Sequence, residues 1–304
     1  MEILDASQTA ARLPYPDLAD SIREVALARS SGGFRTPPRL VLPVQRGGVL
    51  LVMPASDREI SITKLVTVHP ENQARGLPTI RGEVVVMDAT TGERLGLLDG
   101  GVVTARRTAA LSMLAAGELA QHRRGPLLVV GAGTQGRAHL EAFYEGLGVS
   151  EVSVSSRSTD SAEALAGHAR ALGMDARTVE RPEEALEEVG LVVTATTSRE
   201  PVLPDTVPDG VFVAAVGSFE PRAAELPPAL ISNSHVFVDT VEGAKDEAGD
   251  LIQAAQAGAF SWEEATALED ALRSPSPPEG TVVFKSVGHA LWDLAAARTA
   301  FPTG

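Results

Sequence analysis

Three glycines in the middle of the chain have the spacing of a phosphate-binding turn. The motif follows an apolar run at residues 127–130 and opens an expected helix at 137–146. Glycines there permit a tight turn and let a pyrophosphate approach the backbone at the positive end of the helix. The spacing therefore predicts a dinucleotide site, against the alternative of a turn that needs glycine only for steric reasons. The residues assigned to this site are Gly131, Gly133, Thr134, Gln135 and Gly136.

The end of the next expected strand, 151–155, bears on the choice of dinucleotide. A site that prefers NAD usually has an Asp or Glu there, whereas this chain has Ser156, Arg157 and Ser158. A guanidinium flanked by hydroxyls suits a ribose 2′-phosphate through charge-assisted hydrogen bonds. We therefore predict NADPH as the cofactor, with NADH as the second possibility and a solvated surface arginine as the alternative to both.

A lysine lies on the apolar face of an expected strand at residues 60–68. Lys64 has the same parity as Ile60, Ile62 and Val66, and it is one of only three lysines in the chain. Because a buried ammonium needs a counter-charge, a bound anion or a core carboxylate must accompany it. We predict the bound anion. Arg39, with the parity of Val41, is a second candidate on weaker grounds.

Two further cations stand near the start of an expected helix at 105–119. Thr104 is placed to cap that helix, which puts Arg106 and Arg107 in its first turn. Cations are unfavourable at this positive end, and a ligand carboxylate or phosphate would remove the penalty. The alternative is that both arginines are solvated.

Other kinds of catalytic site are not indicated. The chain has no cysteine, its six histidines are scattered without HxxxH spacing, and it has no GxSxG motif. We predict no metal site.

The composition limits the partners. The chain has 304 residues and a formal charge of −14, with no block rich in Lys or Arg, so nucleic acid and acidic membrane surfaces are not expected partners. The acidic start and the absence of a long apolar run predict neither a signal peptide nor a membrane span, and the expected location is the cytoplasm.

The pattern of elements predicts an α/β fold with two domains. Continuous apolar runs that alternate with helical stretches predict a doubly wound parallel sheet of the Rossmann type at 119–280. Before it, strands separated by Gly, Pro and Asp turns predict an antiparallel or mixed sheet in an α+β domain at 1–118. A Pro-rich break at 274–280 precedes a strand, turn and helix, and we assign residues 281–304 to the first domain. The expected parallel strands are 127–130, 151–155, 191–195, 211–216 and 236–239.

Several motifs in order resemble the ornithine cyclodeaminase/mu-crystallin family, over about residues 35–301. They are KLVTVHPEN at 64–72, GLPTIRG at 76–82, LLDGGVVTARRTAALS at 97–112, VGAGTQG at 130–136, AAVGSFEPRAAEL at 214–226 and VVFKSVGHALWDLAAA at 282–297. The resemblance implies a homodimer in which a Rossmann domain accompanies a substrate and dimerisation domain built from both chain ends. It also implies cyclodeaminase, alanine dehydrogenase or ketimine reductase activity.

The same resemblance assigns roles to residues. Arg39, Lys64 and Arg107 match the cluster that binds the substrate carboxylate, and Thr79 matches a polar residue near the substrate; Lys64, Arg107 and Thr79 form the expected catalytic set. Thr108 is expected toward the diphosphate, and Ser286 and Gly288 lie in a motif near the nicotinamide. Thr196, Val216 and Gly217 complete the expected cofactor contacts.

Two departures from the family decide between its activities. The resembling cyclodeaminases have Glu and Asp where this chain has Leu51 and Phe219. Without these acids the ammonium of ornithine lacks a counter-charge and a general base, whereas an apolar wall suits the ring of a cyclic imino acid. The prediction is therefore NAD(P)H-dependent reduction of Δ1-pyrroline-2-carboxylate or Δ1-piperideine-2-carboxylate to L-proline or L-pipecolate. Ornithine cyclodeaminase, alanine dehydrogenase and a non-catalytic binder of NADPH or a small ligand remain as alternatives, and ordinary core packing remains open for Leu51 and Phe219.

Overall fold

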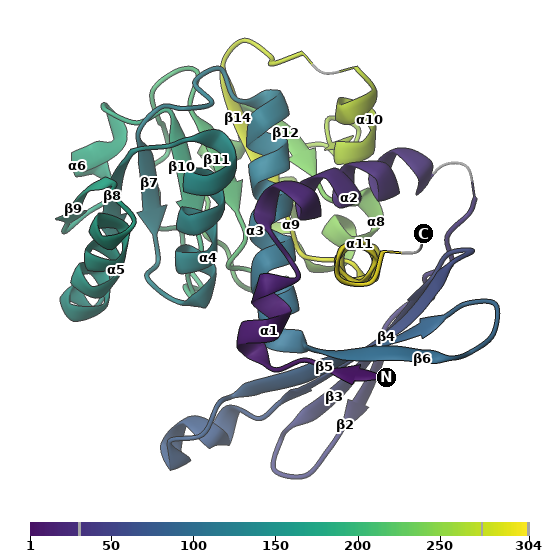
Figure 1. Ribbon diagram of the computed structural model, residues 1–304. Coiled ribbons are helices and arrows are strands. Elements are labelled where there is room, and N and C mark those ends of the chain that lie inside the picture. The colour runs from purple at the N-terminus through teal and green to yellow at the C-terminus, as the bar shows by residue number, and fades with distance from the viewer. Residues whose placement is uncertain (30–31, 275, 303–304) are drawn as a thin grey trace. The chain divides into compact units, whose positions relative to one another are not determined.

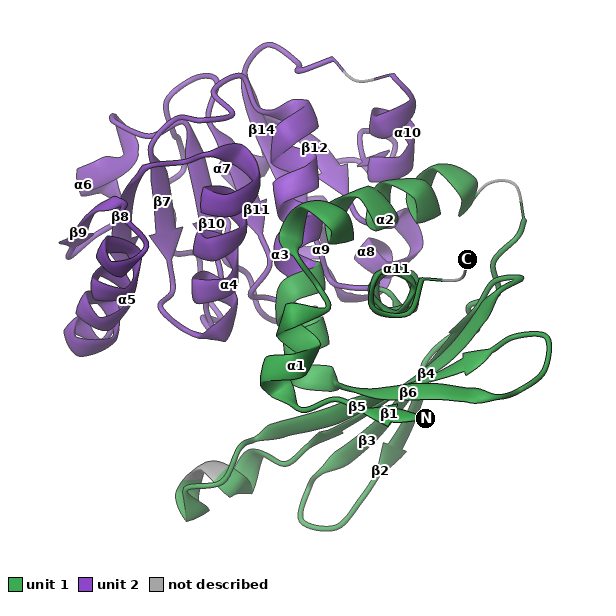
Figure 2. Ribbon diagram, in the orientation of Figure 1, with its two compact units in different colours: residues 1–107, 289–304 green, residues 108–288 purple. Residues whose placement is uncertain are grey.

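The computed structural model describes residues 1–29, 32–274 and 276–302 of the chain. Two compact units are formed, unit 1 from residues 1–107 and 289–304 and unit 2 from residues 108–288 (Figure 2). Unit 1 therefore combines both ends of the chain, and unit 2 is one continuous segment.

Unit 1 contains a six-stranded sheet in the order β1-β6-β5-β4-β3-β2. Strands β2 to β6 pair antiparallel with their neighbours, and the short β1 pairs parallel with β6. The mixed sheet expected from the Gly, Pro and Asp turns is confirmed. The strands are β1 (Glu2–Ile3), β2 (Leu40–Pro43), β3 (Val49–Ser56), β4 (Ile60–Val68), β5 (Ile80–Asp88) and β6 (Arg94–Asp99).

Helices cover one face of this sheet. Helix α11, from the C-terminal part of the chain, packs on β3 and β4 and also on α2 (Figure 2). The covered face has a period of two, with Ile60 and Ile62 buried on β4 and Val84 and Val86 buried on β5. The helices of this unit are α1 (Ala6–Ala11), α2 (Tyr15–Ala28), the 3₁₀ helix η2 (Pro70–Arg75) and α11 (Ala290–Ala300).

Unit 2 contains an eight-stranded parallel sheet in the order β13-β12-β14-β11-β10-β7-β8-β9 (Figure 1). The chain runs outward from β7 to β8 and β9, then returns to the other side of β7 at β10. The order therefore reverses between β7 and β10, where ligands bind in doubly wound sheets. The strands are β7 (Leu127–Val130), β8 (Glu151–Ser155), β9 (Asp175–Val179), β10 (Leu191–Thr194), β11 (Phe212–Ala215), β12 (Ser234–Val238), β13 (Thr266–Ala267) and β14 (Thr281–Lys285).

The helices of unit 2 pack on this sheet. Helix α4 contacts β7 and β10, and side chains of α7, α8 and α9 join a core with Leu128, Val192 and Val213 of the sheet. Both strand faces are apolar, because a parallel sheet with such cover has no solvated face. The helices are α4 (Thr134–Ala142), the π-helical turn η3 (Phe143–Leu147), α5 (Thr159–Ala171), α6 (Glu183–Leu186), α7 (Pro228–Ser232), α8 (Val241–Glu247), α9 (Gly249–Gln256) and α10 (Leu268–Arg273).

The boundaries of the units differ from the predicted ones at 118/119 and 280/281. Strand β14 pairs parallel with β11 and β12, so residues 281–285 belong to the sheet of unit 2 and not to the first domain. All five of its side chains are buried, which suits a central strand. Pro275, within the expected Pro-rich break, lies outside the described residues.

Helix α3 (Gly100–Leu119) begins earlier than expected. The Asp99 carboxylate accepts a hydrogen bond from the Val102 N–H at 2.8 Å, which caps the helix despite its two initial glycines. Thr104 lies inside the helix, where its hydroxyl donates to the Gly100 carbonyl. The prediction that Thr104 caps the helix and that Arg106 and Arg107 lie in its first turn was therefore wrong.

No helix among residues 1–29, 32–274 and 276–302 is long and apolar enough to cross a membrane.

Candidate active site

The turn after β7 is built for close approach of a ligand to the backbone. Gly131 has a φ of +110°, and a Cβ there would lie 2.4 Å from the Ala195 carbonyl oxygen. A Cβ on Gly136 would lie 1.9 Å from the Gly131 carbonyl oxygen, so both positions require glycine. A Cβ on Gly133, in contrast, would meet nothing within 4 Å. The first and third glycines pack the turn, and the middle one leaves open space beside it.

The open space adjoins the start of helix α4. Gly133 is the N-cap of this helix and offers no side-chain cap, so the first N–H groups have no side-chain acceptor from that residue. Together with the helix dipole they form a site for an anion such as a pyrophosphate. Thr134 and Gln135 belong to this first turn.

A groove of about 550 Å³ lies at the point where the strand order reverses. It is lined by the glycine turn, by Ser155 at the end of β8 with the three residues that follow it, and by Ala195 to Ser198 after β10. Arg157 donates a hydrogen bond to the Thr197 hydroxyl at 3.5 Å, and Ser158 caps helix α5. The predicted residues Gly131, Gly133, Ser156, Arg157, Ser158 and Thr196 all line this groove.

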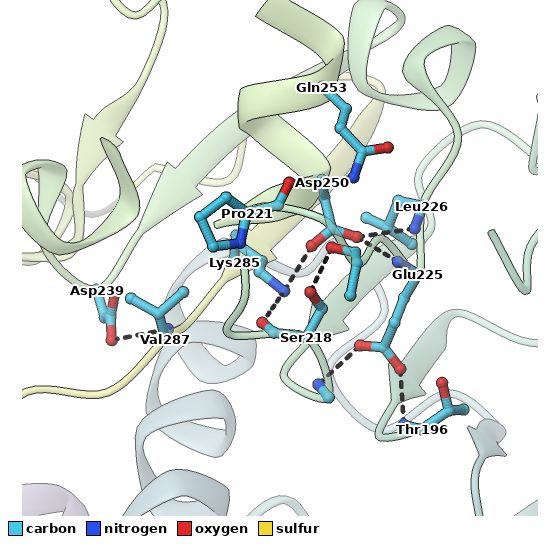
Figure 3. A network of polar contacts seen from close by, with 12 residues as sticks. Thr196, Ser218, Pro221, Glu225, Leu226, Asp239, Asp250, Gln253, Lys285 and Val287 are labelled. Carbon is cyan, nitrogen blue, oxygen red and sulfur yellow. Dashed lines mark hydrogen bonds and ion pairs between the residues drawn. The ribbon is translucent and has the colours of Figure 1, made fainter. Parts of the chain in front are cut away.

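A buried carboxylate ties two of the loops beyond the sheet together. Glu225 accepts hydrogen bonds from the Thr196 N–H and the Gly217 N–H, both at 2.7 Å (Figure 3). These residues follow β10 and β11, so Glu225 fixes the spacing of two neighbouring loops. Burial raises the pKa of Glu225, and the charge of Lys285 opposes that shift.

The same network continues inward as a buried ion pair. Lys285 at the end of β14 lies 2.6 Å from Asp250 and donates to the Ser218 carbonyl at 2.7 Å (Figure 3). The other Asp250 oxygen accepts from the backbone N–H groups of Glu225 and Leu226. This chain of contacts holds the segment after β11, in which the predicted substrate residue Phe219 is 53% exposed.

A third carboxylate, Asp239, organises the turn after β14. One of its oxygens accepts from the Ser286 hydroxyl at 2.9 Å and from the N–H groups of Val287 and Gly288. The polar groups of Ser286 and Gly288 are thus already bonded to the protein. Their predicted role beside a nicotinamide stays a prediction, as do those of Thr108 and Val216, which are both buried.

Unit 1 contains a second buried charged cluster. Lys64 is 3% exposed, and its ammonium lies 3.0 Å from the carboxylate of Asp293 on helix α11. Asp293 is itself fully buried. Arg107 Nε lies 3.4 Å from the same Asp293 oxygen. The counter-charge of Lys64 in the structure is therefore a core carboxylate, which was the alternative to the predicted bound anion. This single carboxylate is shared by two cations, Lys64 and Arg107.

The charges around Lys64 oppose one another. Burial lowers the pKa of Lys64, Asp293 raises it, and Arg107 and Arg39 lower it further. Arg39, which is half-buried just before β2, therefore contributes to the field at this site. Arg106 does not belong to the cluster, because it donates to the Leu13 carbonyl and stacks over the Tyr15 ring.

The register of the sheet places an apolar residue on the Lys64 face. Leu51 pairs with Val66, and Met53 pairs with Lys64, so all four side chains share one face. Leu51 is half-buried there, as an apolar wall would require. Thr79 is half-buried just before β5, and its carbonyl accepts from the His69 N–H.

Four acids of these clusters were missed from the sequence. They are Glu225, Asp239, Asp250 and Asp293. A signal existed for Asp293, because it is the one acid in the apolar helical run ALWDLAAA, and a carboxylate among such residues needs a buried cation.

A family model describes nearly the whole chain. The match to the ornithine cyclodeaminase/mu-crystallin family covers residues 2–302. This chain belongs to that family. The fold, the glycine turn and the motifs that carried the resemblance agree with it.

Several known proteins and solved structures are similar to this chain over almost their full length. The Δ1-pyrroline-2-carboxylate/Δ1-piperideine-2-carboxylate reductase of Azospirillum brasilense is 42% identical over 301 residues, 98% of this chain and 94% of that protein. The structure of the Thermococcus litoralis Δ1-pyrroline-2-carboxylate reductase in complex with NADH and L-proline has a TM-score of 0.90 at 29% identity, covering 99% of this chain and 96% of that one. An archaeal alanine dehydrogenase dimer with bound NAD has a TM-score of 0.89 at 25% identity, covering 99% and 94%.

Proposed function

We propose that this family member is an NAD(P)H-dependent reductase of Δ1-pyrroline-2-carboxylate or Δ1-piperideine-2-carboxylate, with L-proline or L-pipecolate as product. The observation that carries the proposal is the cluster in unit 1, where Lys64 and Arg107 share one carboxylate in a buried setting. A site with excess positive charge binds a ligand carboxylate, which both imino acids have. The 42% identity to the Azospirillum reductase supports the same substrates.

The chain's own groups supply binding and orientation in this reaction. The ammonium of Lys64 and the guanidinium of Arg107 hold the substrate carboxylate, with Arg39 adding to the positive field. Leu51 on the same sheet face packs against ring methylenes, at roughly 0.8 kcal/mol per buried CH₂. The reduced nicotinamide supplies the hydride to the imine carbon when it is bound. Positioning of this kind accounts for much of the rate in such reactions.

For the cofactor we propose a preference for NADPH. The fit of a dinucleotide is supported by the open space at Gly133 and by the groove that runs from there to Arg157. Arg157 is exposed in that groove between two serines, with no carboxylate at residues 155–158, which suits a 2′-phosphate.

Replacement of Arg157 tests this preference. Loss of a charge-assisted phosphate contact costs about 1.5 to 3 kcal/mol, so Arg157→Ala should raise the KM for NADPH by about one to two decades and leave that for NADH little changed. Arg273→Ala, which removes an arginine of unit 2 outside the groove lining, serves as the control. Equal losses with both cofactors, or a wild type that prefers NADH, would exclude the preference.

We also propose that unit 1 is the substrate and dimerisation domain of a homodimer and that unit 2 is the dinucleotide domain. Cross-strand pairing places Val52, Leu65, Val85 and Leu97 on the face of the unit 1 sheet opposite Lys64. These apolar side chains are only half-buried, as expected of a face that a second copy covers. The dimeric archaeal relative supports this arrangement.

A substrate panel separates this function from the other activities of the family. Purified protein with NADPH is offered the two cyclic imino acids and, separately, pyruvate with ammonia, while ammonia release is measured from L-ornithine with NAD. Reduction of a cyclic imino acid should be fast, and ornithine should release no ammonia above background, because Leu51 and Phe219 give its ammonium no counter-charge. Ammonia release at a comparable rate supports the cyclodeaminase, turnover of pyruvate supports the alanine dehydrogenase, and NADPH binding without any turnover supports a non-catalytic binder.

A further inference from the structure

The acidic member of the unit 1 cluster has an unusual set of contacts. Asp293 is fully buried, and one of its oxygens is shared by Lys64 at 3.0 Å and Arg107 at 3.4 Å. Its other oxygen is buried and has no hydrogen-bond partner among the described residues, and the same holds for Arg107 Nε. Buried polar atoms are rarely left in this state, so the cluster is built to accept a further polar group.

The position of Asp293 in the fold explains how the cluster is assembled. Lys64 comes from β4, Arg107 from α3 and Asp293 from α11, which packs on β3 and β4. Two buried cations at such short distance repel each other, and Asp293 is the carboxylate that both of them contact. Without it, the charges of the described residues that act most on the Lys64 ammonium are those of Arg107 and Arg39, and burial together with these two cations favours the neutral amine.

We propose that Asp293 is a positioning residue that keeps Lys64 charged and aimed with Arg107, and that it thereby sets the alkaline limit of substrate-carboxylate binding. The inference rests on the proposed function for its catalytic consequence, but the protonation of Lys64 can be measured without turnover. Asp293 itself balances only one of the two cations, and the substrate carboxylate balances the other. The cluster therefore attracts an anion while staying assembled in its absence.

The small number of lysines makes a direct measurement practical. The chain has three, Lys64, Lys245 and Lys285, so protein grown with lysine labelled by carbon-13 at Cε gives three resonances. Lys64→Arg assigns the signal of Lys64 by its loss. Titration of this signal follows the charge of Lys64 whether or not any imine is reduced.

Asp293→Asn is the decisive variant. Its Lys64 pKa should fall below that of the wild type, because the attraction of the Asp293 carboxylate is gone while burial, Arg107 and Arg39 remain. Asp57→Asn is the matched control, since it removes an ion pair to Arg298 of the same helix α11 at 2.9 Å outside the cluster. An unchanged Lys64 pKa in Asp293→Asn, or an equal fall in Asp57→Asn, overturns the proposal.

The catalytic consequence is tested by the pH profile for the imino acid. In Asp293→Asn the alkaline limb of kcat/KM should move to lower pH by the same shift as the Lys64 pKa, mainly through KM. In Lys64→Arg this limb should be absent, because the guanidinium stays charged, and adding Asp293→Asn should not restore it. If kcat/KM of Asp293→Asn is instead lower than that of the wild type by the same factor at every pH, Asp293 has a purely structural role and the proposal is overturned.

A second measurement covers the case in which Asp293→Asn does not fold. Asp293→Glu keeps a carboxylate at this position, so the Lys64 signal should report a charged ammonium over the same pH range as in the wild type. A Lys64 that is neutral in Asp293→Glu at a pH where the wild-type lysine is charged overturns the proposal. If no cyclic imino acid is reduced by the wild type while Lys64 responds as described, the proposed function fails and the role of Asp293 stands.

Discussion

Two buried clusters of charge, one in each unit, are made of the same side-chain types and are balanced differently. In unit 2, Lys285 faces Asp250 and the Ser218 carbonyl, and the neighbouring Glu225 accepts two backbone N–H groups. In unit 1, Lys64 and Arg107 share one oxygen of Asp293. The first cluster is rich in acceptors that bond to the backbone, and the second has more cation than anion.

The difference shows how to separate a structural ion pair from a binding site. Backbone donors occupy the carboxylates of unit 2, so that cluster fixes loops and has little to offer an anionic ligand. The unit 1 cluster joins side chains from three separate elements. In both clusters one carboxylate oxygen has no hydrogen-bond partner among the described residues. In unit 2 that Asp250 oxygen lies 2.6 Å from Lys285, whereas in unit 1 both ion pairs of Asp293 go to its other oxygen. Both lysines are buried, so burial alone does not separate a structural lysine from a ligand-binding one. The balance of positive and negative charge among the neighbouring side chains does.

The largest expected effect is on the stability of unit 2. Lys285→Met keeps the unbranched stem of the side chain up to the position of Cε, removes the ammonium, and leaves Asp250 as a buried carboxylate without its cation. Removal of one partner of a buried pair costs about 3 to 5 kcal/mol, so chemical denaturation should show a loss of that size in the free energy of unfolding. A variant with wild-type stability but weak imino acid binding would reverse the assignment of the two clusters.

Much of the fold could be predicted from the sequence, because its strands differ in periodicity. The five continuous apolar runs of unit 2 form strands β7, β8, β10, β11 and β12, and the alternation around Lys64 gives the covered face of β4. The strand at 281–285 was assigned to the wrong sheet. Its sequence, TVVFK, is apolar throughout, but only pairing with strands distant in the chain decides between two sheets.

Prediction of the site was incomplete for a related reason. The glycine turn and Lys64 were accessible because each depends on local spacing. Asp293 lies 229 residues from Lys64, and Asp250 and Glu225 come from other elements than Lys285. Such contacts depend on tertiary packing, and Asp99 as the cap of α3 was hidden by two glycines that disfavour a helix start.

A smaller effect is expected on how stability depends on pH, and it comes from His139, a buried histidine of unit 2 that is held neutral. His139 on α4 is fully buried, its Nδ1 lies 2.8 Å from the Gln135 carbonyl, and its Nε2 lies 3.0 Å from the Ser112 hydroxyl. Since the carbonyl can only accept, Nδ1 carries the proton and Nε2 accepts from Ser112. Burial lowers the pKa of His139 from 6.5 to about 4.

The sign of the resulting pH dependence follows from this lowered pKa. Above pH 6.5 the imidazole is neutral in both states, and between 6.5 and about 4 only the unfolded chain takes up the proton. The stabilisation of wild type over His139→Gln should therefore shrink by on the order of 3 kcal/mol as the pH falls through this range. Denaturant unfolding of both proteins at several pH values measures it, and a constant difference would show that His139 is not held neutral.

The smallest expected change in stability accompanies the sharpest change in catalysis. Lys64→Met is the counterpart of Lys285→Met, but here Arg107 stays 3.4 Å from Asp293 and keeps the carboxylate paired. The variant should lose less stability than Lys285→Met, while kcat/KM for the cyclic imino acid falls at least a hundredfold, about 2.7 kcal/mol, because the substrate carboxylate loses one of its two cations. Binding of NADPH, followed by fluorescence titration, should be unchanged, since the groove residues all lie in unit 2.

If Lys64→Met instead keeps its activity and melts as early as Lys285→Met, both lysines belong to structural ion pairs. The substrate carboxylate would then have to bind elsewhere in unit 1, and the comparison from which the proposed function derives would no longer hold.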